Sequence, residues 1–116
     1  MNHDLDRDLA MSLFGKIKLS VDAETKAFLD RCNCGWVNIF NDRENKKHFM
    51  ITYPKGEYIH PEWLVIRVKE ALLALGIVLV AVNINEVRYC YFLSSDRFRH
   101  TGKSENGKFS EYLGNK

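Results

Sequence analysis

The amino-acid sequence predicts a single α+β domain, and three observations support this prediction. The chain has 116 residues, 46% of them hydrophobic and 28% charged, which suits one folded core rather than a disordered or fibrous protein. Apolar side chains recur at helical spacing in two separate segments. Short apolar runs, bounded by polar turn residues, lie before, between and after these segments and indicate strands.

The first two elements are expected between residues 16 and 35. Residues 16–21, KIKLSV, alternate polar and apolar side chains, which is the pattern of a half-buried strand. Asp22 is a good N-cap, and apolar residues follow it at helical spacing. A helix is therefore expected to start at Asp22 and to end at Gly35.

A β-hairpin is expected next. The runs GWVNIF at 35–40 and KKHFMITYP at 46–54 are apolar and aromatic, and the polar cluster NDREN separates them. In the second run Phe49, Ile51 and Tyr53 share one face, and we interpret that face as core. The alternative is an exposed aromatic surface on which unpaired bases stack.

The segment HPEWLVIRVKEALLALG, residues 60–76, gives the clearest helical pattern. Pro61 suits the first helical position, a stripe of leucines and valines follows, and Gly76 supplies the stop. The apolar run IVLVAV at 77–82 then predicts a central strand, and EVRYCYFL at 86–93 predicts one more.

The resulting order, βαββαβ with an additional strand, is that of a ferredoxin-like fold. This split βαβ arrangement is an antiparallel sheet with two helices on one face, here with an extra C-terminal strand. We expect residues 1–15 to form an N-terminal amphipathic segment and residues 16–96 the single α+β domain. Residues 97–116 are expected to form a basic C-terminal tail with an apolar anchor.

Composition excludes several classes of protein. The net charge of +2 is far from the strongly basic balance of a dedicated nucleic-acid binder. Three cysteines do not make a disulfide framework, which favours a reducing, cytoplasmic location. The longest apolar run, residues 71–82, is too short to cross a bilayer, so no membrane partner is expected.

The basic residues concentrate in the region 41–55 and in the tail, where cations flank Phe98 and His100 on a glycine-spaced backbone. Such an arrangement suits phosphates and stacked bases. The sequence HTGKS lacks the first glycine of a phosphate loop, because Arg97 stands at that position. No cofactor is expected. The predicted nucleic-acid contacts are Arg43, Lys46, Lys47, Arg97, Arg99 and Lys103.

Aromatic side chains offer a second kind of contact surface. Tyr89 and Tyr91 share a face of their expected strand, and each has an apolar ring with a polar tip. Both also fit the edge of a core. Phe109 and Tyr112 belong to the apolar anchor, which would dock on its own domain or on a partner. The predicted protein contacts are Trp36, Tyr89, Tyr91, Phe109 and Tyr112.

Catalytic or metal chemistry has little support in the sequence. Cys32 and Cys34 form a single Cys-x-Cys pair without a second pair of ligands at zinc-finger spacing. The only Cys/His option joins Cys90 to His48 or His60. We therefore expect a non-enzymatic regulatory or accessory protein without metal, which binds nucleic acid or a nucleoprotein complex. The alternatives are a protein-binding inhibitor or adaptor, and thirdly a thiol or metal enzyme; a homodimer fits any of them.

Overall fold

The computed structural model describes residues 3–40 and 45–111. In these two ranges the chain folds as a mixed α+β structure in which three helices pack on one six-stranded sheet. The elements in chain order are α1 (His3–Leu19), α2 (Ala23–Leu29), β1 (Asn33–Phe40), β2 (Asn45–Thr52), α3 (Pro61–Ala74), β3 (Leu79–Ile84), β4 (Val87–Ser94), β5 (Arg97–Glu105) and β6 (Lys108–Glu111).

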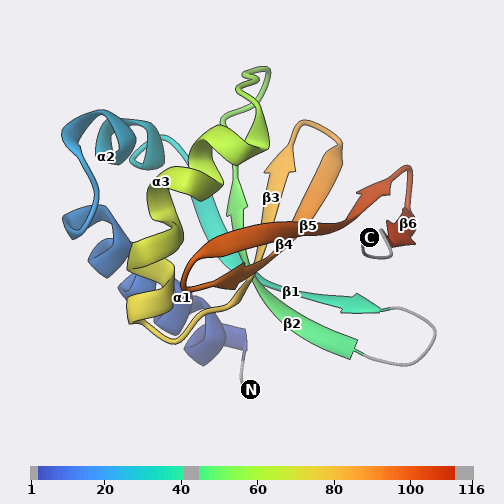
Figure 1. Cartoon of the computed structure of the whole chain (residues 1–116), viewed down its shortest axis with the longest axis horizontal. Helices are drawn as coiled ribbons and strands as arrows, with labels where there is room; N and C mark the ends of the chain where they lie inside the picture. Colours follow the sequence, from blue (N-terminus) through green and yellow to red (C-terminus); the bar gives the residue numbers. More distant parts are fainter. Residues whose placement is uncertain (1–2, 41–44, 112–116) are drawn as a thin grey trace.

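The strands lie in the sheet in the same order as in the sequence, from β1 to β6. Only β2 and β3 are parallel, because α3 makes the crossover between them; the other neighbours are antiparallel. The helices all lie on one side of the sheet. On the other side the β1–β2 and β5–β6 hairpins diverge, so the sheet is strongly curled (Figure 1).

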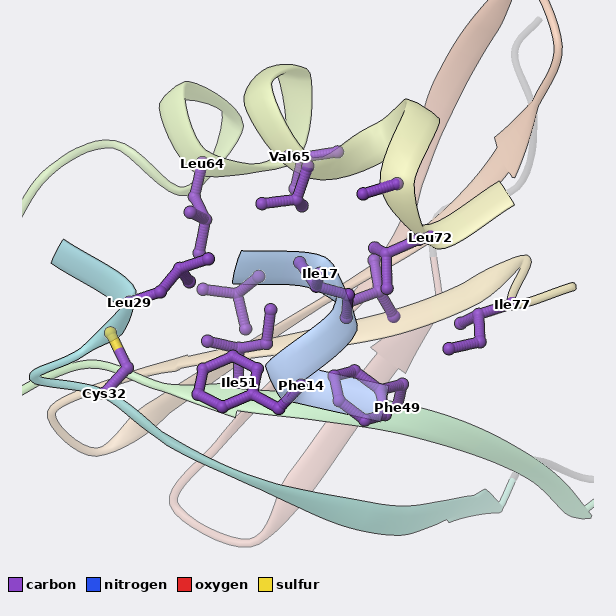
Figure 2. Packing of buried hydrophobic residues seen from close by; sticks show 14 of the residues in the cluster. Phe14, Ile17, Leu29, Cys32, Phe49, Ile51, Leu64, Val65, Leu72 and Ile77 are labelled. Atoms are coloured by element: carbon purple, nitrogen blue, oxygen red, sulfur yellow. The ribbon is translucent and has the colours of Figure 1, made fainter. Parts of the chain in front are cut away.

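The core lies between the three helices and one face of the sheet (Figure 2). Phe14 and Ile17 of α1 and Leu64 of α3 are 5% exposed or less, and they pack above Phe49 and Ile51 of β2. Tyr53 belongs to the same cluster. The interpretation of Phe49, Ile51 and Tyr53 as core is therefore confirmed.

The strand expected at residues 16–21 is wrong, because residues 16–19 form the last turn of α1. Ala10, Phe14 and Ile17 follow one another at helical spacing and are buried, whereas Leu19 is 83% exposed. The helical stripe of the preceding residues thus overrides the local alternation. Lys16 and Lys18 also favour the helix, since cations stabilise the negative end of its dipole.

The helix after Asp22 has the expected start but an earlier end. Asp22 is the N-cap of α2, and its side chain accepts a hydrogen bond from the Thr25 backbone N–H. The helix ends at Leu29, and Gly35 lies inside β1 instead. A Cβ atom at Gly35 would stand 3.2 Å from Cε of Met50, so this glycine makes room for a neighbouring side chain rather than ending a helix.

Helix α3 agrees with its sequence pattern, with His60 as the N-cap, Pro61 in the first turn and Gly76 beyond its end at a φ of 80°. The ferredoxin-like arrangement is not confirmed, because its expected first strand is helical and the strands follow one another sequentially across the sheet. The basic tail expected from residue 97 is instead strand β5 and strand β6 as far as Glu111.

Candidate functional site

The sheet has a second face, turned away from the helices, which we call the open face. In β4, Tyr91 and Leu93 point to the core, so the alternating residues Arg88, Cys90 and Phe92 belong to the open face. Residues paired across neighbouring strands share a face. The strand register therefore adds Asn83 and Ser104 beside Arg88, and Leu79 and Arg99 beside Phe92.

At one end of the open face lies a hollow of about 120 Å³, which we call the basic groove. All six strands contribute to it, so the curl of the sheet is what assembles it. The edge strands β1 and β6 supply its two rims. The residues that line it are Ile39, Lys46, His48, Leu79, Phe92, Arg99, Thr101, Phe109 and Glu111.

The basic groove combines cations with aromatic rings. Cζ of Arg99 lies 5.7 Å from the centre of the Phe92 ring, and Phe92 is 37% exposed. Lys46 supplies the second cation and Phe109 the second ring, while Glu111 adds one carboxylate. The groove therefore presents positive charge next to flat apolar surface.

His48 forms part of the floor of the basic groove and is 3% exposed. Burial lowers the pKa of this imidazole, and the charges of Lys46 and Arg88 lower it further. Its Nδ1 lies 3.1 Å from the backbone oxygen of Lys46, a hydrogen bond that partly opposes this effect. At neutral pH the imidazole is uncharged, so the positive charge of the groove comes from Lys46 and Arg99.

Phe109 is held in place by a close contact with β5. A Cβ atom at Gly102 would stand 2.4 Å from Cζ of the Phe109 ring and 2.7 Å from the backbone oxygen of Ser110. Glycine at position 102 thus lets β6 and its aromatic ring lie directly on the neighbouring strand. Phe109 packs on its own domain as a strand residue, not as part of a helical turn.

A second hollow, of about 340 Å³, lies at the opposite end of the open face, and we call it the polar recess. Arg88 dominates it: Nε donates to Oδ1 of Asn83 at 2.8 Å, and Nη2 donates to Sδ of Met50 at 3.7 Å. Nδ2 of Asn83 in turn donates to Oγ1 of Thr52 at 3.0 Å. Sequence reasoning missed Arg88, although its alternation with Tyr89 and Tyr91 placed it on the other face.

The structure brings together only part of the predicted nucleic-acid contacts. Lys46 and Arg99 both line the basic groove. Arg97 is exposed and lies on the same face as Arg99, two residues away on β5. Arg43 lies outside the described residues.

Two other predicted contacts, Lys47 and Lys103, lie on the face that carries the helices, so the structure does not bring them together with Lys46. Nζ of Lys47 is 3.8 Å from a carboxylate oxygen of Asp6 in α1 and 5.0 Å from the centre of the Trp36 ring. Lys103 is paired with Tyr89 across the strands, and its Nζ lies 3.5 Å from Glu105. Strand alternation explains the division, because neighbouring residues point to opposite faces.

The aromatic protein-contact surface is also divided. Tyr91 is fully buried and stacks on His100 with ring centres 4.6 Å apart, so its assignment as a contact residue is corrected to core. Trp36 is partly buried beneath α1, and its Nε1 donates to the backbone oxygen of Asp6 at 3.1 Å. Tyr89 is partly buried against the core. Tyr112 lies outside the described residues.

The buried cysteine side chains of this structure are poorly suited to act as nucleophiles. Burial raises the pKa of the Cys32 thiol to about 12 and that of Cys90 to about 11, so both remain protonated and weakly nucleophilic at neutral pH. Among residues 3–40 and 45–111, no three histidine, cysteine or carboxylate side chains cluster as metal ligands.

No helix within the described ranges is both long and apolar enough to span a membrane. Comparison of the chain with protein-family models, with curated proteins and with solved structures finds no match in any of the three.

Proposed function

We propose that this protein is a non-enzymatic, cytoplasmic binding protein that holds single-stranded nucleic acid on the open face of its sheet. The main supporting observation is the basic groove, where the guanidinium of Arg99 lies over the exposed ring of Phe92. Lys46 and Arg97 supply further phosphate contacts on the same face, and Phe109 offers a second ring for stacking.

A single strand fits this surface better than a duplex does. The groove is small, and its floor includes apolar side chains such as Leu79 and Phe92. Aromatic rings stack on unpaired bases, whereas the bases of a duplex are already stacked on one another. The low net charge also argues against a protein that relies on many duplex phosphates.

Fluorescence anisotropy with labelled oligonucleotides of about 12 residues tests the proposal, because single-strand sites span about 4–16 nucleotides. Binding through about three phosphates gives a salt slope of about −2, so affinity should fall roughly twentyfold between about 50 and 200 mM salt. Arg99→Gln and Phe92→Ala should each weaken binding about tenfold. Absence of binding at low salt by the wild-type chain contradicts the proposal.

Lys103→Gln is the matched control. It removes the same unit of charge from the same strand β5, but on the face that carries the helices. Its effect on affinity should be less than about twofold, since a charge outside the site acts only through the screened long-range field. Equal losses in Lys103→Gln and Arg99→Gln would mean that net charge, rather than the open face, governs binding.

The competing hypothesis is that the chain binds a protein partner, and the placement of the aromatic residues weakens this hypothesis. Tyr91 is buried and Trp36 is partly covered by α1, so two of the five residues of the expected contact surface offer little area. If the chain does not bind oligonucleotides at low salt, the protein-partner hypothesis replaces the nucleic-acid hypothesis.

A further inference from the structure

The polar recess differs from the basic groove in the kind of ligand it can recognise. Both hollows lie on the open face, and Arg88 precedes Phe92 by four residues on β4, which is about 13 Å along a strand. Between them Ala81 and Cys90 are fully buried, so the two hollows are separate. A ligand chain that lies on the open face would meet both.

The guanidinium of Arg88 is fixed before any ligand arrives. Its Nε is bonded to Asn83, and Asn83 is bonded to Thr52, so the plane of the guanidinium is set by two successive hydrogen bonds. In the described part of the chain no carboxylate forms an ion pair with Arg88. One N–H of Nη2 is directed to Sδ of Met50. The other N–H groups of Nη1 and Nη2 form a positioned pair of donors, which suits a planar ligand with two adjacent acceptors.

The other side chains of the recess narrow the class of ligand. Asn83 and Asn85 carry amides, Thr52 and Ser104 carry hydroxyls, and Glu86 carries a carboxylate. A phosphate offers only acceptors and would be repelled by Glu86. A ligand with both donors and acceptors matches the mixed lining, and about 340 Å³ lies within the range of small-ligand sites.

On the basis of the proposed function, we propose that the polar recess holds a guanine base of the bound strand. Guanine is the base whose O6 and N7 form an adjacent acceptor pair, and an arginine binds this pair with two hydrogen bonds. Its ring N–H and exocyclic amino group are donors, for which the carboxylate of Glu86 is the charged acceptor among the residues that line the recess. Phosphates and stacked bases at the basic groove supply affinity, and Arg88 supplies base preference.

The test uses uridine tracts that differ only at one central base. Wild-type chain should bind the oligonucleotide with a central guanine about tenfold more tightly than the one with adenine. Replacing guanine by 7-deazaguanine, which lacks N7, should remove most of this preference. Replacing guanine by the base of inosine, which lacks the exocyclic amine, should remove part of the preference over adenine. The Glu86→Gln variant should no longer distinguish guanine from inosine.

Two variants of Arg88 test whether its planar guanidinium, rather than its positive charge alone, gives the preference for guanine. Arg88→Gln should reduce the preference for guanine over adenine to about one. Arg88→Lys keeps the positive charge but loses the planar fork, so it should show the same loss of preference. Thermal unfolding followed by circular dichroism identifies any variant that is not folded. If Arg88→Gln is not folded, Arg88→Lys alone tests the proposal.

The outcomes distinguish this inference from the proposed function. Equal binding of all four oligonucleotides by the wild-type chain overturns the guanine site and leaves the basic groove intact. An unchanged preference in Arg88→Lys also overturns it, because a phosphate contact would behave in that way. Absence of binding to every oligonucleotide overturns the proposed function itself.

Discussion

Gly102 shows how one residue controls a large part of the open face. The ring of Phe109 lies where a side chain at position 102 would be, and the backbone oxygen of Ser110 is also within contact distance of that place. Because a backbone atom is involved, rotation of the phenylalanine ring alone does not relieve the clash. Strand β6 would have to move away from β5, and the rim of the basic groove would move with it.

Gly102→Ala should therefore destabilise the protein by about 1–3 kcal/mol, the usual range for overpacking. Urea unfolding followed by circular dichroism measures this loss. Gly15→Ala is the matched control, because Gly15 lies on the exposed side of α1 and a Cβ there meets nothing within 4 Å. That variant should be more stable by roughly 0.5–1 kcal/mol, the gain of alanine over glycine in a helix. A neutral Gly102→Ala variant would show that β6 is not packed as described.

The three cysteines should differ in reactivity with a thiol reagent. Cys90 is fully buried and Cys32 nearly so, whereas Cys34 is only partly buried on β1. Burial raises the pKa of all three thiols, so even Cys34 should react slowly. Native protein should label first at one thiol, and all three should label in denaturant. Cys34→Ser should abolish the first phase; its persistence would mean that Cys32 or Cys90 is accessible.

At the level of elements, the sequence predicts best where one pattern extends over many residues. The stripe of α3 repeats over four turns and has clear signals at both ends, so its bounds were predictable. Residues 16–19 form only the end of a helix, and their local alternation of two residues imitates a strand. Strand β5 was missed because glycine and charged residues interrupt its pattern, and only pairing with β4 and β6 stabilises it.

The strand expected at residues 16–21 and the end of helix α1 found there predict different effects of mutation. A strand places Ile17 and Leu19 on the same face, whereas the helix buries Ile17 completely and leaves Leu19 83% exposed. Ile17→Ala should therefore cost about 2–4 kcal/mol in the free energy of unfolding. Leu19→Ala should change it by less than about 0.5 kcal/mol, as for other surface substitutions. Similar losses in both variants would contradict the helix.

The site depends on the whole molecule more than any single element does. Six strands line the basic groove, and no local pattern in the sequence indicates which of their residues meet. Composition and alternation suggested Lys46 and Arg99, which both line the basic groove, together with Lys47 and Lys103, which lie on the other face. The curl of the sheet and its register decide this selection, and both arise from long-range packing.

The free energy of unfolding of the whole fold should depend on pH through two of its histidines. Burial lowers the pKa of His48 in the basic groove and that of His100 beside Tyr91. The unfolded chain therefore binds more protons than the folded chain once the pH falls below the ordinary histidine value of about 6.5. The free energy of unfolding should decrease as the pH is lowered from about 7.5 to 5.5.

Urea titrations across this range measure the effect. His48→Gln should flatten the pH dependence, and the double variant with His100→Gln should flatten it further, because each removes a group whose pKa is lowered by burial in the fold. The pKa values of the Asp22 and Asp30 carboxyls are lowered by hydrogen bonds from Thr25 and Lys26 respectively, so their contribution is lost only at more acidic pH. A free energy of unfolding that does not change with pH would mean that both imidazoles contact solvent, and one that increases as the pH falls to 5.5 would mean that they contact carboxylates. In either case the floor of the basic groove would differ from the one described.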